Sequence, residues 1–275
     1  MLLPDKVAII NGGATGIGRA TAIKFAEEGC SSVIADINEA GAQETVKEVK
    51  KRGSECVFVK CDITDPKQIK SCVDQSIKKF GKVDILVGCA GGVPKSLVRT
   101  PPKAGERPRR GIAYTDEAFY DIMLNLNLKG HVFFCKEAAP YMIKQNYGKI
   151  ILISSQGALA PPSPSVEYHT AKAGILGLVY NLAFELAPHR ITVNGILPGP
   201  IKTPFYDQIM AGMTEKERVA RFEEMGKSVP LQRIGLPEDI ANAILFFASE
   251  LSSWITGETL LVTGGKPLSV YHPPE

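Results

Sequence analysis

The chain has 275 residues, of which 44% are hydrophobic and 22% charged, and its net charge is +3. These values are typical of a soluble globular protein with one large or two small domains. Residues 99–110 (RTPPKAGERPRR) hold five basic residues and one acidic residue, a charge of +4, so the rest of the chain carries 3 − 4 = −1. The basic charge is therefore local, and the composition does not imply a general nucleic-acid or membrane surface.

Short apolar runs alternate with longer amphipathic runs from residue 6 to residue 265. The pattern predicts strands at 6–12, 31–36, 56–62, 83–91, 148–155, 191–199 and 257–265. It predicts helices at 17–29, 39–53, 65–81, 116–144 (as one long helix) and 166–187, with more helical material before the last strand. Strands rich in Val, Ile and Leu on both faces, separated by helices, indicate a parallel sheet covered by helices. The prediction is an α/β fold: one domain over residues 1–275 with a Rossmann-like, doubly wound parallel sheet.

The N-terminus and the cysteines bear on the cellular compartment. The first apolar run leads directly into a predicted strand and has no basic segment before it, so neither a signal peptide nor a membrane span is expected. The six cysteines form no C-x-x-C pair, and the four histidines form no metal-ligand cluster. We therefore expect buried free thiols, no metal site and a cytoplasmic location.

A glycine-rich segment follows the first predicted strand and opens the first helix. It reads NGGATGIG, with Gly12, Gly16 and Gly18 spaced G-x-x-x-G-x-G. Glycines at such a turn let the backbone approach a pyrophosphate, whose charge the helix N-terminus stabilises. The segment is therefore a candidate dinucleotide-binding loop, in which Thr15 and Ile17 also line the cofactor site.

Asp36 ends the second predicted strand, eighteen residues after Gly18. A carboxylate there can accept hydrogen bonds from the adenosine ribose and would repel a 2′-phosphate. No Arg or Lys occupies position 15 or directly follows Asp36. NAD is therefore the expected cofactor, in preference to NADP; a turn aspartate without this role is the alternative.

The segment YHTAK places Tyr168 and Lys172 one turn apart on one face of a predicted helix. A tyrosine hydroxyl near its reference pKa of about 10 is a poor base at neutral pH. An adjacent ammonium would lower this pKa, so that the tyrosine could exchange a proton with a substrate. The pair alone is weak evidence, but it would meet the glycine loop at one edge of the sheet, where such folds bind ligands.

Residues 6–265 resemble the short-chain dehydrogenase/reductase family. The matching segments, in the order of the family, are GGATGIG, Asp36, CDIT, GCAG, NLKG, ISS, YHTAK and PGPIKT. The resemblance implies hydride transfer between a nicotinamide cofactor and an alcohol or ketone, with four catalytic residues. These are Asn127, Ser155, Tyr168 and Lys172.

The resemblance also implies a role for each of these residues. Tyr168 would be the acid in ketone reduction and the base in alcohol oxidation, while Lys172 would hold the nicotinamide ribose and lower the tyrosine pKa. Ser155, rather than Ser154, would orient the reacting oxygen, and Asn127 would hold a water that continues the proton relay. The cofactor would further contact Asp62, Ile63, Ala90, Gly91, Pro198, Gly199, Ile201 and Thr203.

Two departures from the family pattern stand near the glycine loop. Asn11 replaces the usual threonine, and Gly88 and Cys89 replace two asparagines of the usual Asn-Asn-Ala-Gly. The side-chain amides of those asparagines brace the central sheet in the family. We therefore expect some loss of local hydrogen bonding here, without loss of the hydride chemistry.

Two segments are candidates for substrate recognition. Between Gly91 and Asn127 lie 35 residues, about ten more than the resemblance implies, and the excess is largely the basic stretch of a Pro-rich insertion at about 93–115. Arg guanidinium groups bind carboxylates and phosphates, so an anionic substrate such as a hydroxyacyl-CoA or a hydroxy acid is the first hypothesis. The second segment, at about 203–226, would form a lid. The candidate substrate residues are Arg107, Arg109, Arg110, Gln156, Phe205, Tyr206 and Met210.

Several alternatives stay open. The basic stretch could be a solvated surface loop or a subunit contact, and the substrate could be a neutral alicyclic or steroid-like alcohol. A non-catalytic NAD-binding regulator and a Rossmann methyltransferase are other classes, although neither uses the tyrosine–lysine pair. The resemblance further implies a homo-oligomer, a tetramer or dimer joined through the helices at 116–144 and 166–187. The expected partner is otherwise a small molecule, with no nucleic acid or membrane.

Overall fold

A computed structural model describes residues 1–93, 112–161, 165–207, 210 and 212–265 of the chain. The predicted strands are all present within a few residues of their expected ends. They are β1 (Val7–Asn11), β2 (Ser31–Asp36), β3 (Cys56–Lys60), β4 (Ile85–Gly88), β5 (Gly148–Ile153), β6 (Ile191–Pro198) and β7 (Thr259–Val262). All pair in parallel, in the order β3-β2-β1-β4-β5-β6-β7. The predicted doubly wound parallel sheet is confirmed.

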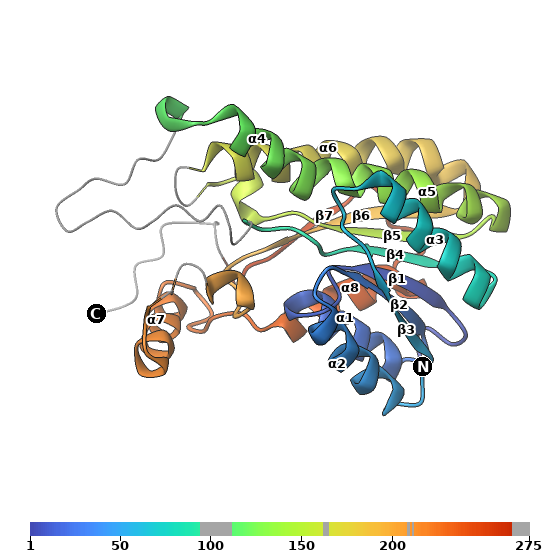
Figure 1. The fold of residues 1–275 in the computed structure, drawn as a ribbon, viewed down its shortest axis with the longest axis horizontal. Coiled ribbons are helices and arrows are strands. Elements are labelled where there is room, and N and C mark those ends of the chain that lie inside the picture. The colour runs from blue at the N-terminus through green and yellow to red at the C-terminus, as the bar shows by residue number, and fades with distance from the viewer. Residues whose placement is uncertain (94–111, 162–164, 208–209, 211, 266–275) are drawn as a thin grey trace.

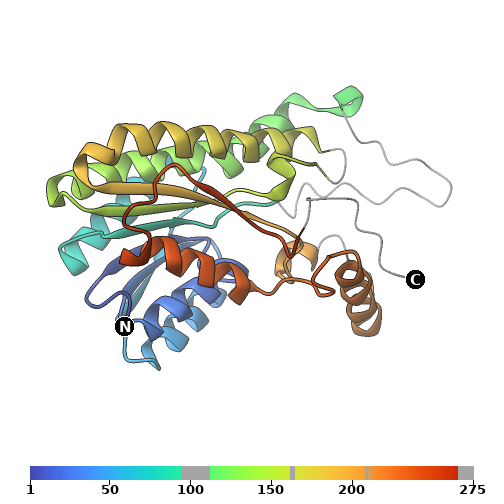
Figure 2. The same cartoon turned by 180° about the vertical axis from the view of Figure 1, so that it is seen from behind.

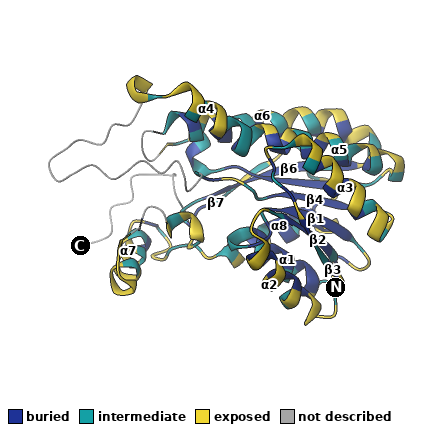
Figure 3. Cartoon of the chain, viewed as in Figure 1, coloured by how far each residue is buried: buried dark blue, intermediate teal, exposed yellow. Residues whose placement is uncertain are grey.

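The helices cover both faces of the sheet, as Figures 1 and 2 show. α1 (Gly16–Glu27), α2 (Glu39–Lys50) and α8 (Pro237–Ala248) cover one face. α3 (Pro66–Phe80), α4 (Glu117–Leu124), α5 (Gly130–Gln145) and α6 (Val166–Leu186) cover the other, and α7 (Glu215–Lys227) lies beyond the carboxyl edge of the strands. The central strands β1, β2, β4, β5 and β6 are therefore almost entirely buried, whereas the edge strands β3 and β7 are partly exposed (Figure 3).

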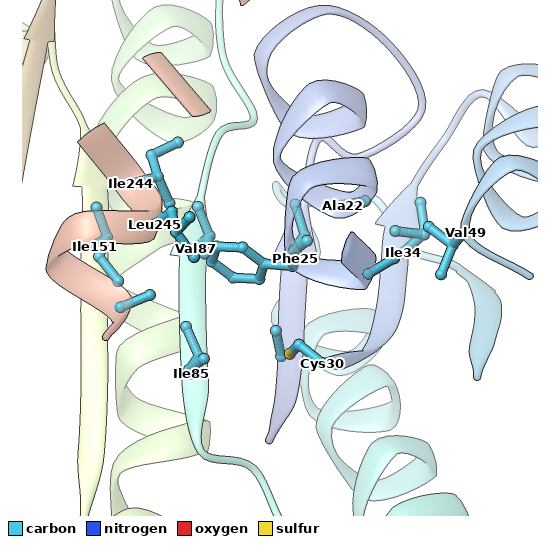
Figure 4. Close-up of a cluster of buried hydrophobic side chains, with 14 of the residues drawn as sticks. Ala22, Phe25, Cys30, Ile34, Val49, Ile85, Val87, Ile151, Ile244 and Leu245 are labelled. Carbon is cyan, nitrogen blue, oxygen red and sulfur yellow. The ribbon is translucent and has the colours of Figure 1, made fainter. Parts of the chain in front are cut away.

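Each face of the sheet has its own apolar cluster. Figure 4 shows the first, in which Phe25 of α1 packs between Ile34 of β2 and Ile85 and Val87 of β4. The second lies between the strands and α3, α5 and α6, with the fully buried Phe134 among its members. Because both faces of every central strand are buried, the strands read as continuous apolar runs rather than alternating ones.

The predicted helix at 116–144 is continuous in space but not uniform. α4 and α5 are joined by a π-helical segment, Asn125–Lys129, that contains the candidate residue Asn127. A π segment inserts one residue into the turn, which the apolar periodicity did not reveal.

The two expected substrate segments are described only in part. Of the insertion at about 93–115, Val93 and residues 112–115 are described, and a 3₁₀ turn spans Ile112–Tyr114. The basic stretch at 99–110, with Arg107, Arg109 and Arg110, and the C-terminal residues 266–275 lie outside the described residues. The segment at 203–226 contains the 3₁₀ turn Pro204–Asp207 and most of α7.

The part of the chain that the structure describes contains no helix of the length and apolar character needed to cross a membrane. Its six cysteines are free thiols, as predicted, and all but Cys89 are buried.

Candidate active site

The site lies where β1 and β4 adjoin at the centre of the sheet. Asn11, the last residue of β1, pairs with Gly88, the last residue of β4. The chain runs outward from β1 to β3 on one side and from β4 to β7 on the other, so the strand order reverses between β1 and β4. In doubly wound sheets the loops at such a switch point leave a crevice between them. Ligands of doubly wound sheets bind at this crevice.

The glycine loop has a backbone course that only glycine permits. Gly12 has φ of +71°, and a Cβ there would lie 2.6 Å from the Ala90 nitrogen. A Cβ on Gly18 would collide with the carbonyl oxygen of Gly12. The loop therefore presents bare backbone at the N-terminus of α1, a form that fits a pyrophosphate.

Asp36 sits beside this loop at the end of β2. Its Oδ2 accepts a hydrogen bond of 2.9 Å from the Ala14 amide, and its Oδ1 accepts one of 2.9 Å from the Asn38 amide. Arg19, on α1, donates instead to the carbonyl oxygen of Ala14 and pairs with Glu44 at 3.0 Å. A carboxylate without a free guanidinium beside it suits ribose hydroxyls better than a 2′-phosphate.

The other expected cofactor residues lie along the same edge. Thr203 closes over the loop, because a Cβ on Gly16 would lie 3.2 Å from its Cγ2. Ile63 is buried against Gly130, and the Asp62 carboxylate accepts from the Thr64 amide and hydroxyl. Pro198, Gly199 and the buried Ile201 follow the end of β6. The structure thus brings the expected cofactor residues to one edge of the sheet.

Lys172 lies one turn after Tyr168 on α6, and both face this crevice. The buried Lys172 Nζ donates to the carbonyl oxygen of Ile153 at 3.0 Å and lies 5.8 Å from the centre of the Tyr168 ring. Burial lowers the pKa of Lys172 to about 8, so its ammonium form still predominates at neutral pH.

The expected lowering of the Tyr168 pKa by Lys172 is wrong for the free protein. Although Tyr168 keeps some exposed surface, burial raises the pKa of its hydroxyl to about 12, and a hydrogen bond with Ser155 opposes this only in part. The reason is physical: removing the phenolate from water costs more than the hydrogen bond returns. Tyr168 is therefore a protonated acid in the protein without ligands.

The two serines after β5 have different partners. The buried Ser154 donates from Oγ to the carbonyl oxygen of Lys172 at 2.7 Å and so ties β5 to α6. The partly exposed Ser155 accepts from the Gly157 amide at 3.1 Å and lies close enough to Tyr168 to lower the pKa of its hydroxyl. Only Ser155 can therefore reach a substrate oxygen next to the tyrosine hydroxyl.

Asn127 clamps the segment after β4. Its side chain is buried, accepts from the Gly92 amide at 2.8 Å and donates to the Gly92 carbonyl at 2.9 Å. Gly91, with φ of +152°, passes so close that a Cβ would lie 2.8 Å from Asn127 Oδ1 and 3.1 Å from Lys172 Nζ. Asn127 therefore sets the backbone of the crevice wall next to Lys172.

Aromatic side chains pack next to Tyr168. The rings of Phe205 and Tyr168 have centres 6.1 Å apart, and Phe205 also lies over Gly92. Tyr206 packs edge-on against Phe205 at 5.5 Å and against Phe222 of α7 at 5.8 Å, while Met210 is buried.

Gln156 lies directly after Ser155, with a buried Oε1 that has no hydrogen-bond partner among the described residues. An unpaired buried acceptor beside a catalytic centre is available for a ligand hydroxyl or amide. Gln156 therefore stays a candidate substrate residue on geometry.

Around Gly88 and Cys89, Asn11 Nδ2 and His131 Nδ1 are buried without a hydrogen-bond partner among the described residues, which agrees with the expected loss, whereas the Ala90 peptide is bonded on both sides. Asn11 Oδ1 accepts from the Ala90 amide at 2.9 Å, and the buried His131 on α5 bonds the Ala90 carbonyl oxygen at 2.9 Å. Sequence reasoning missed His131, because a single histidine in an apolar helix shows no pattern of its own. Its one available signal was the unusual glycine at position 88.

Comparison with known proteins identifies the family to which the chain belongs. A family model described as enoyl-(acyl carrier protein) reductase matches residues 12–266. The chain is 35% identical to the 3-oxoacyl-[acyl-carrier-protein] reductase FabG of Thermotoga maritima, over 96% of this chain and 99% of that protein. The chain belongs to the short-chain dehydrogenase/reductase family. As a member of this family it is an oxidoreductase.

Two further relatives differ in what their names say of their substrates. One is the (2S)-[(R)-hydroxy(phenyl)methyl]succinyl-CoA dehydrogenase subunit BbsD of Thauera aromatica, 35% identical over 98% of this chain and 99% of its own length. The other is the solved structure of a 7α-hydroxysteroid dehydrogenase complexed with NADH and 7-oxo glycochenodeoxycholic acid. It is 34% identical, with a TM-score of 0.83 over 98% of this chain and 97% of that one. The family therefore fits the fold and the site, while its members' names cover several substrates.

Proposed function

We propose that this oxidoreductase transfers a hydride between NAD(H) and a secondary alcohol or ketone. One observation carries the proposal: the Tyr168 hydroxyl, close enough to Ser155 for that residue to lower its pKa and one turn from the buried ammonium of Lys172, lies at the same sheet edge as the glycine loop. This arrangement supplies a proton donor, a hydrogen-bond donor and a positive charge beside a dinucleotide site.

The residues that would hold NAD(H) are those described above at the carboxyl edge of the sheet. The backbone around Gly12 and Gly18 and the N-terminus of α1 would hold the pyrophosphate, Asp36 the ribose, and Thr203 and Lys172 the nicotinamide end. The chemistry that a bound nicotinamide supplies is the hydride itself.

In ketone reduction, Tyr168 gives its proton to the carbonyl oxygen as that oxygen becomes an alcohol. Its O–H bond breaks, the alcohol O–H bond forms, and the charge left on the phenolate is stabilised by the Lys172 ammonium. Ser155 donates a hydrogen bond to the same oxygen and so fixes its distance from Tyr168. A water at Asn127 would return the proton to Tyr168 through Lys172; in alcohol oxidation each transfer runs in reverse.

NAD is proposed in preference to NADP. The Asp36 carboxylate would repel a 2′-phosphate, and Arg19, the basic residue at the start of α1, is engaged by Ala14 and Glu44. The related hydroxysteroid dehydrogenase is described as a complex with NADH, which supports the same choice.

The substrate is proposed to have an apolar body and an anionic end. Phe205, Tyr206 and Met210 supply an apolar wall next to Tyr168, and the basic stretch at 99–110 follows the same sheet edge in the chain. The name of BbsD, a dehydrogenase subunit for a hydroxy(phenyl)methyl-substituted succinyl-CoA, supports an anionic thioester. A steroid-like alcohol is the second candidate, supported by the likeness to the 7α-hydroxysteroid dehydrogenase.

The substitution Tyr168→Phe tests the reaction. It removes the acid and keeps the ring, so NADH oxidation with any accepted ketone should fall by about 10²–10⁴-fold while the Kd for NADH stays unchanged. Tyr180→Phe on the exposed face of the same helix is the matched control and should keep full activity. A Tyr168→Phe protein with most of its activity would contradict the proposed acid, and a wild-type protein that binds NADH without turnover would support the non-catalytic regulator.

A panel of 3-oxoacyl-CoA thioesters, keto acids, steroid ketones and neutral cyclic ketones tests the substrate class. We expect the highest kcat/KM for an anionic member, and a rise in its KM when Arg107, Arg109 and Arg110 are neutralised together. An unchanged KM with unchanged salt dependence would remove the anion-binding role of these arginines.

A homo-oligomer, joined through α4, α5 and α6, is proposed from exposed apolar side chains on those helices. Phe184 of α6 is 89% exposed, and Tyr180, Ile122 and Val132 are also exposed. Apolar side chains grouped on neighbouring helices are typical of a subunit interface. Light scattering should therefore give a dimer or tetramer, and Phe184→Glu should reduce the mass, whereas Leu231→Glu, away from these helices, should not.

A further inference from the structure

The peptide of Ala90 is held on both sides by buried side chains from two different elements. Its amide donates to Asn11 Oδ1 at the end of β1, and its carbonyl oxygen contacts His131 Nε2 of α5; both distances are 2.9 Å. Ala90 lies two residues after β4, at the crevice where the cofactor is proposed to bind. The two bonds therefore anchor the start of the loop that forms one wall of the crevice.

The proton position on His131 follows from its partner. A carbonyl oxygen only accepts, so Nε2 carries the hydrogen, and Nδ1 is left with a bare lone pair. His131 is fully buried, and Nδ1 has no hydrogen-bond partner among the described residues. The ring therefore holds one tautomer and makes one hydrogen bond, the bond to Ala90.

The ring fits because position 88 is glycine. A Cβ on Gly88 would lie 2.7 Å from His131 Nδ1 and 2.9 Å from Leu152 Cδ2. Any side chain at 88, including the asparagine usual in the family, would need the space that the imidazole fills. The His131 imidazole therefore fits in this place only because residue 88 has no side chain.

The ring stays uncharged near Lys172. Burial and the positive charge of Lys172 lower the pKa of His131 to about 3, while the bond to Ala90 opposes this only in part. The titratable group that acts on His131 is Lys172 on α6. His131 therefore supplies a donor without adding a second positive charge beside the catalytic lysine.

The anchored loop leads directly to the catalytic groups. Gly91 follows Ala90 and passes within close contact of Asn127 Oδ1 and Lys172 Nζ, and Gly92 exchanges two hydrogen bonds with the Asn127 amide. A shift of Ala90 would move Gly91 against both side chains. The position of Ala90 is therefore coupled to the groove and to Lys172.

We propose that His131 is a positioning residue that, together with Asn11, fixes Ala90 in place of the missing asparagine amides and so holds the cofactor groove in its binding form. It acts on the reaction through Ala90, not through contact with the reacting atoms. The proposal rests on the proposed function, because the cofactor is what the groove would bind.

Three variants test this positioning role by the Kd for NADH, the Tm and the steady-state constants. His131→Leu removes the donor at similar size and should raise the Kd and KM for NADH about tenfold or more, with a smaller change in kcat. His131→Gln keeps an N–H donor and should bind NADH within about threefold of the wild type. Phe134→Leu, buried one turn along α5, removes no hydrogen-bond donor and should lower the Tm without changing the Kd.

Equal NADH affinity of the His131→Leu and wild-type proteins would overturn the proposal. The proposal would also be overturned if Phe134→Leu and His131→Leu lowered the Tm equally and lost the same affinity for NADH. The loss of stability alone would then explain both results. Failure of the His131→Gln variant to recover affinity over His131→Leu would also count against the donor.

The nitrogen NMR shifts of the His131 ring in the unmodified protein provide a measurement that needs no variant. We expect the neutral tautomer with hydrogen on Nε2, unchanged between about pH 5 and pH 8. Hydrogen on Nδ1, or protonation within that range, would overturn the assignment. If the wild type binds neither NADH nor NADPH, the proposed function fails, and these shifts still decide whether His131 holds Ala90.

Discussion

The glycine loop offers a comparison between two glycines with nearly the same backbone. Gly12 has φ of +71° and Gly81, which ends α3, has φ of +76°. A Cβ on Gly12 would meet the Ala90 nitrogen at 2.6 Å, whereas a Cβ on Gly81 would have nothing within 4 Å. Replacing each with alanine therefore applies the same backbone penalty and differs only in the collision.

The expected losses in the free energy of unfolding for Gly81→Ala and Gly12→Ala follow from these φ angles and distances. A left-handed conformation costs a residue with a Cβ roughly 1–2 kcal/mol, so Gly81→Ala should lower the free energy of unfolding by about that amount. The Gly12 contact is 3.4 − 2.6 = 0.8 Å shorter than ordinary van der Waals contact, and the atoms it meets belong to backbone. Overpacking of this kind adds about 1–3 kcal/mol, which gives about 2–5 kcal/mol for Gly12→Ala.

Denaturant unfolding and NADH titration separate the two variants. Gly81→Ala should keep the wild-type Kd for NADH, while Gly12→Ala should push Ala90 away from Asn11 and raise the Kd about 100-fold or more, because the glycine loop and Ala90 would both be displaced. Equal stability losses and equal Kd values for the two variants would refute the reasoning, since the collision would then have no consequence.

Further predictions concern Ser154, Ser155, Lys172 and Asp36. Ser154→Ala removes the bond to the Lys172 carbonyl and should cost about 1 kcal/mol of stability, whereas Ser155→Ala should leave stability unchanged and lower kcat; a reversal of these effects would contradict the assignment. Because the pKa of Lys172 is lowered to about 8 and Tyr168 stays protonated up to about 12, kcat/KM for ketone reduction should be flat below about pH 8 and fall above it. A profile flat to about pH 10 would exclude the ammonium as the controlling group. Asp36→Asn keeps a hydrogen-bond acceptor but removes the charge, and it should shift the NADH-to-NADPH preference about tenfold toward NADPH, measured as the ratio of kcat/KM values; an unchanged ratio would mean that the carboxylate does not select the cofactor.

Much of the fold follows from the sequence, because its elements are strongly patterned. The buried strands are apolar on both faces, and helix ends carry clear markers: Asp65 caps α3, with Pro66 at its first turn and the left-handed Gly81 after its last. Such local features act through a few neighbouring residues, so sequence alone places them to within a few positions. The glycine loop and the tyrosine–lysine pair were recognisable for the same reason.

The features that sequence reasoning missed depend on contacts between distant segments. The π-helical segment at Asn125–Lys129 places Asn127 against Gly92, a residue 35 positions away. The bond between His131 and Ala90 spans 41 positions, and its fit depends on the missing side chain at Gly88. The spacing of apolar residues along the sequence does not reveal contacts between residues so far apart in the chain. An unusual residue at one position, here glycine for asparagine, indicates only that some partner elsewhere has changed.

The error over Tyr168 has the same origin, and it bears on how the site works. Spacing along a helix shows that an ammonium is near a phenol, but not how far both are removed from water. Burial acts on the two groups in opposite directions: it raises the pKa of Tyr168 and lowers that of Lys172, because each charged form loses solvation. The free protein therefore holds a protonated phenol beside an ammonium group whose pKa is lowered. This state is suited to donating a proton to a ketone. Alcohol oxidation needs the phenolate, which requires additional positive charge near the hydroxyl, and an oxidised nicotinamide carries such a charge.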